Sequence, residues 1–358
     1  MNVEALFSIK QYSLPHEEKT QILIKGLNEL TRYHLEHSKE YFRLMSIIHP
    51  QFRTPSALSQ IAYLPIRLFK SHKLVSIPDS EIFKVLTSSG TTSQTVSKIY
   101  LDRETARKQT VALAKIMTYT LGPERLPMII VDTRNLFKNR KTFSARGAGV
   151  LGMINFGRDH FYALDENMEL DEAGLKDFLK EHGDAAFLIF GFTFVVWKHF
   201  LMRLIDAGFD LSKGILIHSG GWKKLKEEAV DNNEFKSRFE QATGLKRIYN
   251  FYGMVEQIGS VFLEGEDGYL FAPNYADVII RDPETWEEAS IGKPGVIQVL
   301  SLLPSSYPGH SILTEDLGVV HGIDDSSCGR RGKYFSVIGR VPQAELRGCS
   351  DTYAYGGS

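Results

Sequence analysis

The chain has 358 residues, of which 43% are hydrophobic and 24% are charged, with a formal net charge of −1. These are the proportions of an ordinary globular protein that is long enough for one large domain or two, and the near-zero charge argues against general attraction to nucleic acid or to a membrane surface. No apolar run is long enough to span a membrane, and two cysteines, Cys328 and Cys349, exclude a disulfide framework and a four-cysteine zinc site.

The N-terminal end shows no basic stretch leading into an apolar one, so no secretory signal is expected and a reducing cytoplasm is the expected location. Apolar residues at three- and four-residue spacing predict helices over 5–50, with a break at Pro15 and an end at His49-Pro50. The prolines in residues 51–80 then predict an extended connector.

A β-prone stretch, Ile82 to Leu86, leads into the loop 87–98, and Asp102 can cap an amphipathic helix predicted from Arg103 to Leu121. From there, short apolar runs alternate with helical patterns. Strands are expected at 128–131, 186–190, 214–218 and 248–251, a strand or a glycine-rich turn at 147–156, and helices at 171–182, 194–207 and 223–243, the last two closed by Gly208 and Gly244.

After residue 259 the pattern changes to short alternating runs separated by Gly, Pro and Asp, at 278–280, 296–300 and 334–338. The expected fold is therefore α/β, with a mostly parallel sheet covered by helices and then a β-rich segment. Its expected parts are an N-terminal helical and extended part over 1–80, a nucleotide-binding core over 81–258, a β-rich subdomain over 259–338, and a hinge with a tail over 339–358.

Within the loop 87–98, residues 88–93 place five hydroxyl side chains around Gly90, and the loop ends at Lys98. Because glycine lacks a Cβ, the backbone can turn sharply and approach a ligand closely, and hydroxyl and N–H groups together can form a nest for an anion. This composition suits the polyphosphate of a nucleotide, although a plain surface loop accounts for it as well. The chain contains no Walker motif.

Two further polar stretches, Ser219-Gly220-Gly221 and 250–256, follow predicted strands. Ligands of open α/β sheets bind at the carboxyl ends of the strands, so we expect these stretches and the loop 87–98 to converge there. Tyr252 could stack on a base and Glu256 could hold Mg²⁺ beside phosphates. The competing interpretations are a core aromatic residue, a solvated carboxylate and a simple glycine turn.

In this order the stretches resemble the motifs of the AMP-forming adenylate synthetase superfamily. The phosphate loop is similar at 89–98, with Ser93 in place of a glycine and Lys98 displaced by two positions, and Tyr252-Gly253-Met254-Val255-Glu256 differs from the family motif only by Val255 for threonine. Thr314-Glu315-Asp316 resembles the ribose-binding Thr-Gly-Asp, and Gly339-Arg340 resembles the hinge motif.

The sequence from Gly339 to Thr352, which contains Cys349, closely resembles the LuxE-type acyl-protein synthetases within that superfamily. The chain stops 18 residues after Arg340, so we expect the superfamily's C-terminal lid domain, with its adenylating lysine, to be lacking or truncated. The resemblance implies Cys349, Lys98 and Arg340 as catalytic residues and Glu256 as the magnesium ligand. The nucleotide-binding residues that it implies are Ser88, Ser89, Gly90, Thr91, Thr92, Ser219, Gly220, Gly221, Asn250, Phe251, Tyr252, Gly253, Glu256 and Asp316.

The implied activity is ATP-dependent activation of a carboxylic acid, most simply a fatty acid, as acyl-AMP, with transfer to a thiol and hand-off to a reductase. A carboxylate is a poor electrophile, and a mixed anhydride with AMP makes it open to attack by a thiolate. Residues 191–194 are a candidate for the acyl pocket by the same analogy. Two alternatives stay open: a ligase that uses coenzyme A as acceptor, and a non-catalytic subunit that binds a nucleotide or an acyl-adenylate.

Overall fold

The computed structural model describes residues 3–51, 53–88, 96–137, 145–222 and 229–341. These residues form two compact units, which we describe separately. Unit 1 comprises the described residues up to 88, residues 96–119 and residues 253–341, and unit 2 comprises the described residues from 120 to 252. The four consecutive parts expected from the sequence stay a prediction.

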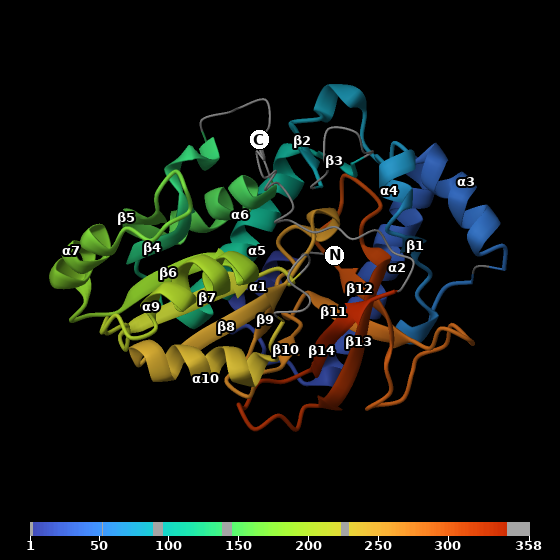
Figure 1. Ribbon diagram of the computed structural model, residues 1–358. Coiled ribbons are helices and arrows are strands. Elements are labelled where there is room, and N and C mark those ends of the chain that lie inside the picture. The colour runs from blue at the N-terminus through green and yellow to red at the C-terminus, as the bar shows by residue number, and fades with distance from the viewer. Residues whose placement is uncertain (1–2, 52, 89–95, 138–144, 223–228, 342–358) are drawn as a thin grey trace. The chain divides into compact units, whose positions relative to one another are not determined.

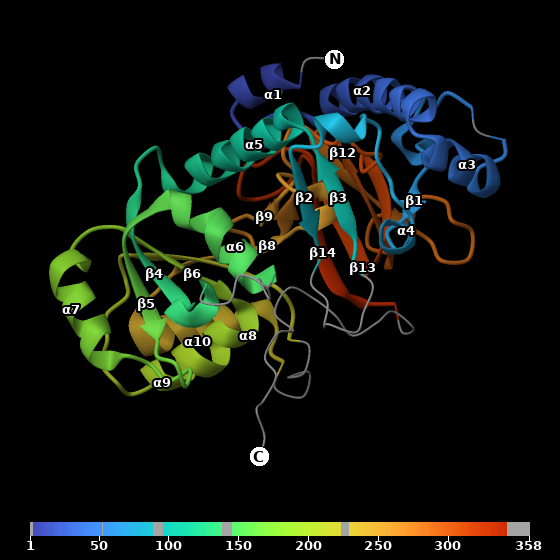
Figure 2. The ribbon, with the colours of Figure 1, turned by 90° about the horizontal axis from the view of Figure 1, so that it is seen from above.

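Unit 2 is a parallel sheet in the strand order β5-β4-β6-β7-β8 (Figure 1). Helices α6 and α10 lie on opposite sides of this sheet (Figures 1 and 2). The strands are β4 (Leu126–Thr133), β5 (Gly157–Leu164), β6 (Phe187–Phe192), β7 (Gly214–Ser219) and β8 (Arg247–Tyr252). The helices are η3 (Arg134–Phe137), α6 (Ala145–Met153), η5 (Ile154–Phe156), α7 (Glu172–His182), α8 (Thr193–Val195), η6 (Val196–Leu201), α9 (Met202–Leu204) and α10 (Asn232–Thr243).

Unit 1 is built on an antiparallel sheet in the order β11-β12-β13-β14-β10-β9, and β1 pairs in parallel with β13. A separate antiparallel pair is formed by β2 and β3. The strands are β1 (Leu64–Pro65), β2 (Lys84–Thr87), β3 (Lys98–Leu101), β9 (Phe262–Glu264), β10 (Leu270–Phe271), β11 (Ala276–Arg281), β12 (Gly295–Ser301), β13 (Ser311–Ile323) and β14 (Lys333–Arg340). The helices are α1 (Glu4–Ser8), α2 (His16–His37), α3 (Lys39–Ile48), η1 (Leu58–Gln60), α4 (Leu68–Ser71), η2 (Asp79–Glu81), α5 (Arg103–Leu121, mostly in this unit) and η8 (Val255–Gln257).

Several helix ends follow directly from the sequence. Asp171 accepts a hydrogen bond from Gly174 N at the start of α7, and Asp102 accepts one from Thr105 N at the start of α5. Such caps satisfy N–H groups that have no partner within the helix. Gly244 ends α10 in the left-handed conformation that only glycine adopts without strain. The α/β architecture followed by a β-rich segment is confirmed.

Other sequence predictions are corrected by the structure. Residues 147–156 form α6 and η5 rather than a strand, because the buried Arg146, Val150 and Met153 recur at helical spacing. The glycines do not break α6: a Cβ on Gly149 would lie 2.7 Å from the ring of Phe192, so helix and sheet approach closely there.

The prediction that residues 51–80 form an extended connector is also wrong, because this segment contains η1, β1, α4 and η2. The predicted helix 194–207 starts at Thr193, ends at Leu204 and is π-helical in its middle. The described part of the predicted helix 223–243 starts at Asn232, and residues 223–228 lie outside the described residues. The sequence did not predict β5 or the 13-residue β13.

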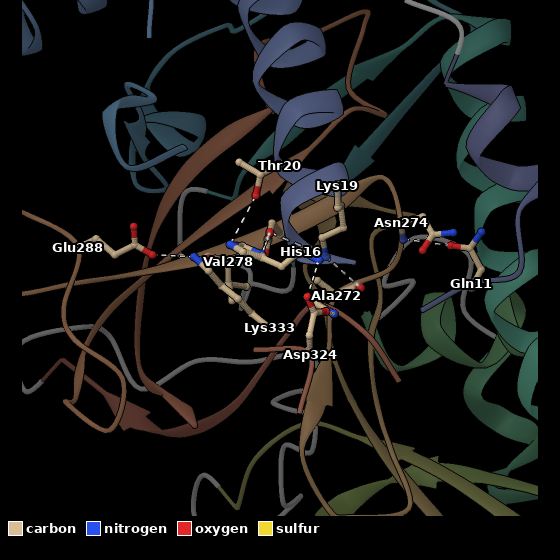
Figure 3. A network of polar contacts seen from close by, with 12 residues as sticks. Gln11, His16, Lys19, Thr20, Ala272, Asn274, Val278, Glu288, Asp324 and Lys333 are labelled. Carbon is tan, nitrogen blue, oxygen red and sulfur yellow. Dashed lines mark hydrogen bonds and ion pairs between the residues drawn. The ribbon is translucent and has the colours of Figure 1, made fainter. Parts of the chain in front are cut away.

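A network of buried charges, the Lys19–Asp277 network, holds the start of α2 against the sheet of unit 1 (Figure 3). Lys19 Nζ lies 3.8 Å from Asp277 Oδ2, and the two side chains are 1% and 0% exposed. His16 N donates to Asp324 Oδ2 at 2.8 Å, which satisfies a donor in the first turn of α2. Lys333, also buried, donates to Val278 O at 3.1 Å.

Candidate active site

The predicted site residues divide between the two units. Unit 1 holds Ser88, Lys98, Gly253, Glu256, Asp316 and Arg340, and unit 2 holds Ser219, Gly220, Gly221, Asn250, Phe251 and Tyr252. The remaining predicted site residues, Ser89, Gly90, Thr91, Thr92 and Cys349, lie outside the described residues.

In unit 1, the two ends of the phosphate loop are joined by hydrogen bonds. Ser88 N donates to Ser97 O at 3.1 Å, and Ser97 N donates to the Ser88 hydroxyl at 2.9 Å. Lys98 is exposed and pairs with Thr87 across β2 and β3. The loop therefore connects a separate antiparallel pair, which corrects the expectation that it follows a strand of the parallel sheet.

Glu256 lies in η8 and is only 4% exposed. Burial raises the pKa of its carboxyl group, while the Ser97 hydroxyl and the Lys70 ammonium act in the opposite direction and Glu315 adds to the rise. The hydroxyl of Tyr307, a fully buried ring, donates to Glu256 O at 2.9 Å and fixes this turn. The competing interpretation of Glu256 as a solvated carboxylate is thus wrong.

Asp316 and Arg340 face each other across β13 and β14, with Arg340 Nε 3.2 Å from Asp316 Oδ1. Thr314 fixes this corner, because its hydroxyl donates to Ile297 O at 2.7 Å and accepts from Asp316 N at 3.1 Å. The two resemblance motifs, which are 24 residues apart in sequence, therefore meet in space through antiparallel pairing.

The segment from Leu64 to Ser71 was missed by the sequence prediction, yet it lies beside this corner. β1 pairs in parallel with Ile312 and Leu313, and Ile66 N donates to Leu313 O at 2.9 Å (Figure 2). Arg67 forms an ion pair with Glu315. The only sequence signal was a pair of cations three residues apart after Pro65, which is too common to single out a site.

In unit 2, the carboxyl ends of β7 and β8 bring Ser219 beside Phe251, as predicted from their strands. The Ser219 hydroxyl donates to Phe251 O at 2.9 Å, and the residues Asn250, Phe251 and Tyr252 are half-buried. Gly220 has a φ of +89° and ends the strand in a conformation that favours glycine.

Two other polar pairs at this edge were not predicted. His218 Nδ1 lies 2.9 Å from the Thr193 hydroxyl, and burial lowers the pKa of His218 to about 3, so the ring is neutral. Asp132, near the end of β4, pairs with Arg146 at 3.0 Å, and burial raises the pKa of Asp132 to about 6. Since β5 and β6 flank β4 on opposite sides, Asp132 and the acyl-pocket candidate 191–194 lie at the switch point of the parallel sheet, and His218 lies on the next strand, β7.

Among the described residues, no three His, Cys, Asp or Glu side chains gather as a metal cluster. Within the same residues no helix is both long and apolar enough to cross a membrane.

Comparison with known proteins gives consistent results. The family described as acyl-protein synthetase, LuxE, matches residues 2–355. A long-chain-fatty-acid–luciferin-component ligase of Vibrio harveyi is 23% identical, covering 95% of this chain and 89% of the relative. The ligase of the same name from Aliivibrio fischeri is 21% identical, covering 97% of this chain and 92% of the relative.

Among solved structures, an open conformation of 2-hydroxyisobutyryl-CoA ligase in complex with 2-HIB-AMP and CoA has a TM-score of 0.70 at 20% identity, covering 92% of this chain and 77% of that one. The same enzyme in its thioesterification state has a TM-score of 0.68. These likenesses identify the fold as that of adenylate-forming ligases. With the match over almost its whole length, the chain belongs to the LuxE acyl-protein synthetase family and is an acid–thiol ligase that activates its substrate by adenylation.

Proposed function

We propose that this enzyme activates a long-chain fatty acid with ATP as acyl-AMP, transfers the acyl group to Cys349, and delivers it to an acyl reductase. The observation that carries the proposal is the family match over residues 2–355, which includes both the phosphate-loop region and the cysteine. The fatty-acid substrate is supported by the names of the relatives from Vibrio harveyi and Aliivibrio fischeri.

Unit 1 contains groups suited to the polar parts of ATP. The paired Asp316 and Arg340 offer a carboxylate acceptor and guanidinium donors, which suit the two hydroxyls of a ribose. Ser88 stands at one end of the loop whose hydroxyls would hold phosphates, and Lys98 stands just beyond its other end. Unit 2, taken by itself, offers the half-buried Asn250 and Tyr252, whose polar groups and ring suit a base.

Glu256 fits a magnesium ion bound together with ATP. Mg²⁺ is commonly held by one or two carboxylates plus substrate phosphates and water, and Glu256 is a carboxylate whose burial makes the ionised form costly without a cation nearby. When bound, the ion would neutralise charge on the phosphates. The residues of the chain that would hold it are Glu256 and, through the phosphates, the loop that begins at Ser88.

The chemistry has two steps. A carboxylate oxygen of the acid forms a bond to the α-phosphorus of ATP, and the bond to pyrophosphate breaks, which gives acyl-AMP. The Cys349 thiolate then attacks the acyl carbonyl carbon, and the bond to the AMP oxygen breaks; the thiol proton has by then passed to water or to a base. The chain contributes charge complementarity to the first step and a nucleophile to the second.

The test is the intact mass of the protein after incubation with magnesium-ATP and a mixture of fatty acids. We expect a hydroxylamine-sensitive adduct that is lost in Cys349→Ser and kept in the control Cys328→Ser. A Cys349→Ser variant that still forms acyl-CoA at the wild-type rate would favour the coenzyme A ligase. ATP binding without pyrophosphate release for any acid would favour the non-catalytic alternative.

A further inference from the structure

The last residue of β6, Phe192, lies in the apolar layer between this strand and α6. Phe190 and Phe192 are two positions apart, so their side chains lie on one face of the sheet, and their ring centroids are 6.0 Å apart. Both residues are almost fully buried, at 0% and 4% exposed. α6 covers this face, as the close approach of Gly149 to the Phe192 ring shows (Figures 1 and 2).

The Phe192 ring fits against α6 because residue 149 is a glycine. A Cβ on Gly149 would lie 2.7 Å from Cζ of Phe192, which is about 1 Å closer than an ordinary contact between two carbon atoms. Cζ is the far end of a side chain that turns about two torsions, so an added methyl group would displace the ring rather than the strand. Gly152, further along α6, differs in this respect, because a Cβ there would meet no described atom beyond its own stretch of helix within 4 Å.

Phe192 also stands at the end of the parallel sheet where ligands bind. β6 pairs with β4 at the switch point, and open α/β sheets bind their ligands beyond the carboxyl ends of the strands at such a point. On its other side, Phe192 is opposite Ser219 of β7, whose hydroxyl donates to Phe251 O. Paired residues of neighbouring strands point to the same face, so the ring lies at the boundary between an apolar layer and a polar edge. A molecule with an apolar chain and a carboxylate fits such a boundary.

We propose that Phe192 forms a wall of the acyl site and that Gly149, by leaving room for the ring, sets the longest acyl chain that the enzyme accepts. The inference rests on the proposed function above, because it takes the fatty acid as the substrate. Phe192 is the specificity-determining residue, and Gly149 is a positioning residue that acts through it. The ring limits how much of the chain can be buried and takes no part in the covalent steps.

The experiment measures ATP–pyrophosphate exchange by the full chain with straight-chain acids from octanoic to octadecanoic acid, in steps of one carbon. The readout is the ratio of kcat/KM between two acids in one protein preparation, which does not depend on the fraction of folded enzyme. In Gly149→Ala the preferred chain should shorten by about one or two carbons, because the ring moves by about 1 Å and a carbon–carbon bond is about 1.5 Å long. For the longest acid that wild type uses well, kcat/KM relative to a shorter acid should fall about 10- to 200-fold, the usual effect of one methylene that does not fit.

Gly152→Ala is the matched control, since it adds the same methyl group to the same helix at a position with open space, and its chain-length profile should equal that of wild type. Phe192→Leu removes the far end of the ring and should lengthen the preferred chain. The double variant of Gly149→Ala with Phe192→Leu should return toward the wild-type profile, because the methyl group then meets no ring.

An unchanged profile in either Gly149→Ala or Phe192→Leu would overturn the inference. An equal shift in Gly152→Ala, or a loss of the same size for every acid, would also overturn it, because either pattern marks altered packing of α6 rather than a fit to the chain. Wild-type enzyme that exchanges pyrophosphate with none of the acids would refute the proposed function, and this inference with it.

Discussion

The Lys19–Asp277 network makes a quantitative prediction about the stability of unit 1. Lys19 Nζ and Asp277 Oδ2 are 3.8 Å apart with side chains that are 1% and 0% exposed, so water cannot replace either partner. Burial lowers the pKa of Lys19, and Asp277 acts against this shift, so the carboxylate favours the charged form of the lysine. Removing the carboxylate leaves an uncompensated buried cation.

Asp277→Leu should therefore lower the free energy of unfolding by about 3–5 kcal/mol, the usual effect of removing one partner of a buried ion pair. Lys19→Met should cost less, because His16 Nδ1 lies 3.9 Å from the same carboxylate oxygen and can take up a proton. Burial lowers the pKa of His16 and Asp277 raises it, so the loss of Lys19 should move this pKa upward. The double variant should come within about 1 kcal/mol of wild type, since two apolar side chains of similar volume replace a pair that costs desolvation.

The assay is urea unfolding followed by tryptophan fluorescence. The sequence has three tryptophans, and Trp286 belongs to unit 1 while Trp197 and Trp222 belong to unit 2. A background with Trp197→Phe and Trp222→Phe thus reports on unit 1 alone. A coupling energy below about 0.5 kcal/mol in the double-mutant cycle would refute the reasoning, because residues in a shared buried ion pair do not act independently.

Two further predictions concern the ribose corner and the buried histidines. Asp316→Ala should weaken ATP binding about 10- to 100-fold, as expected for lost hydrogen bonds to a charged group, with little effect on acylation by synthetic acyl-AMP; equal ATP affinity in calorimetry would contradict the assignment. Burial lowers the pKa of His34 from 6.5 to about 3, so the unfolded chain binds the proton first as the pH falls. This contribution to stability is complete above the unfolded pKa of 6.5 and is lost as the pH falls toward 3, by about 2 kcal/mol at about pH 5. His34→Gln should flatten that part of the pH profile of urea unfolding, and an unchanged slope would argue against a neutral buried ring.

The sequence predicted four of the five strands in the parallel sheet of unit 2, because β4, β6 and β7 carry continuous apolar runs, whereas the missed β5 begins Gly-Arg-Asp-His. Met128 to Val131 and Phe187 to Phe190 are fully buried, and only helices on both faces can bury such runs. The failure to predict helix α6 from the sequence has a local cause. Glycines at 147, 149 and 152 suggested a turn, whereas Gly149 serves the close contact with Phe192.

The site was predictable as motifs but not as an arrangement. Nothing in the sequence indicated that Asp316 and Arg340 face each other, because β13 itself was not recognised; its polar residues, among them Glu315 and His321, interrupt the alternation expected of a strand. The position of Arg67 beside Glu315 is harder still to foresee. β1 has only two residues and is held by its pairing with β13, and α4 has only four residues.

The strand β14 runs from the Lys19–Asp277 network to the Asp316–Arg340 pair, yet we expect changes in the network to affect stability and not catalysis. It begins at Lys333, which is buried in the network, and ends at Arg340, which pairs with Asp316. Seven residue steps along an antiparallel strand span about 24 Å, a distance at which two unit charges interact by less than about 1 kcal/mol at an effective dielectric constant of about 20. A charge change at Lys19 or Asp277 therefore reaches Arg340 only through displacement of the strand, and pairing with β13 along most of its length resists such displacement. Changes in the network should consequently reduce the fraction of folded enzyme and leave the rate per folded molecule intact.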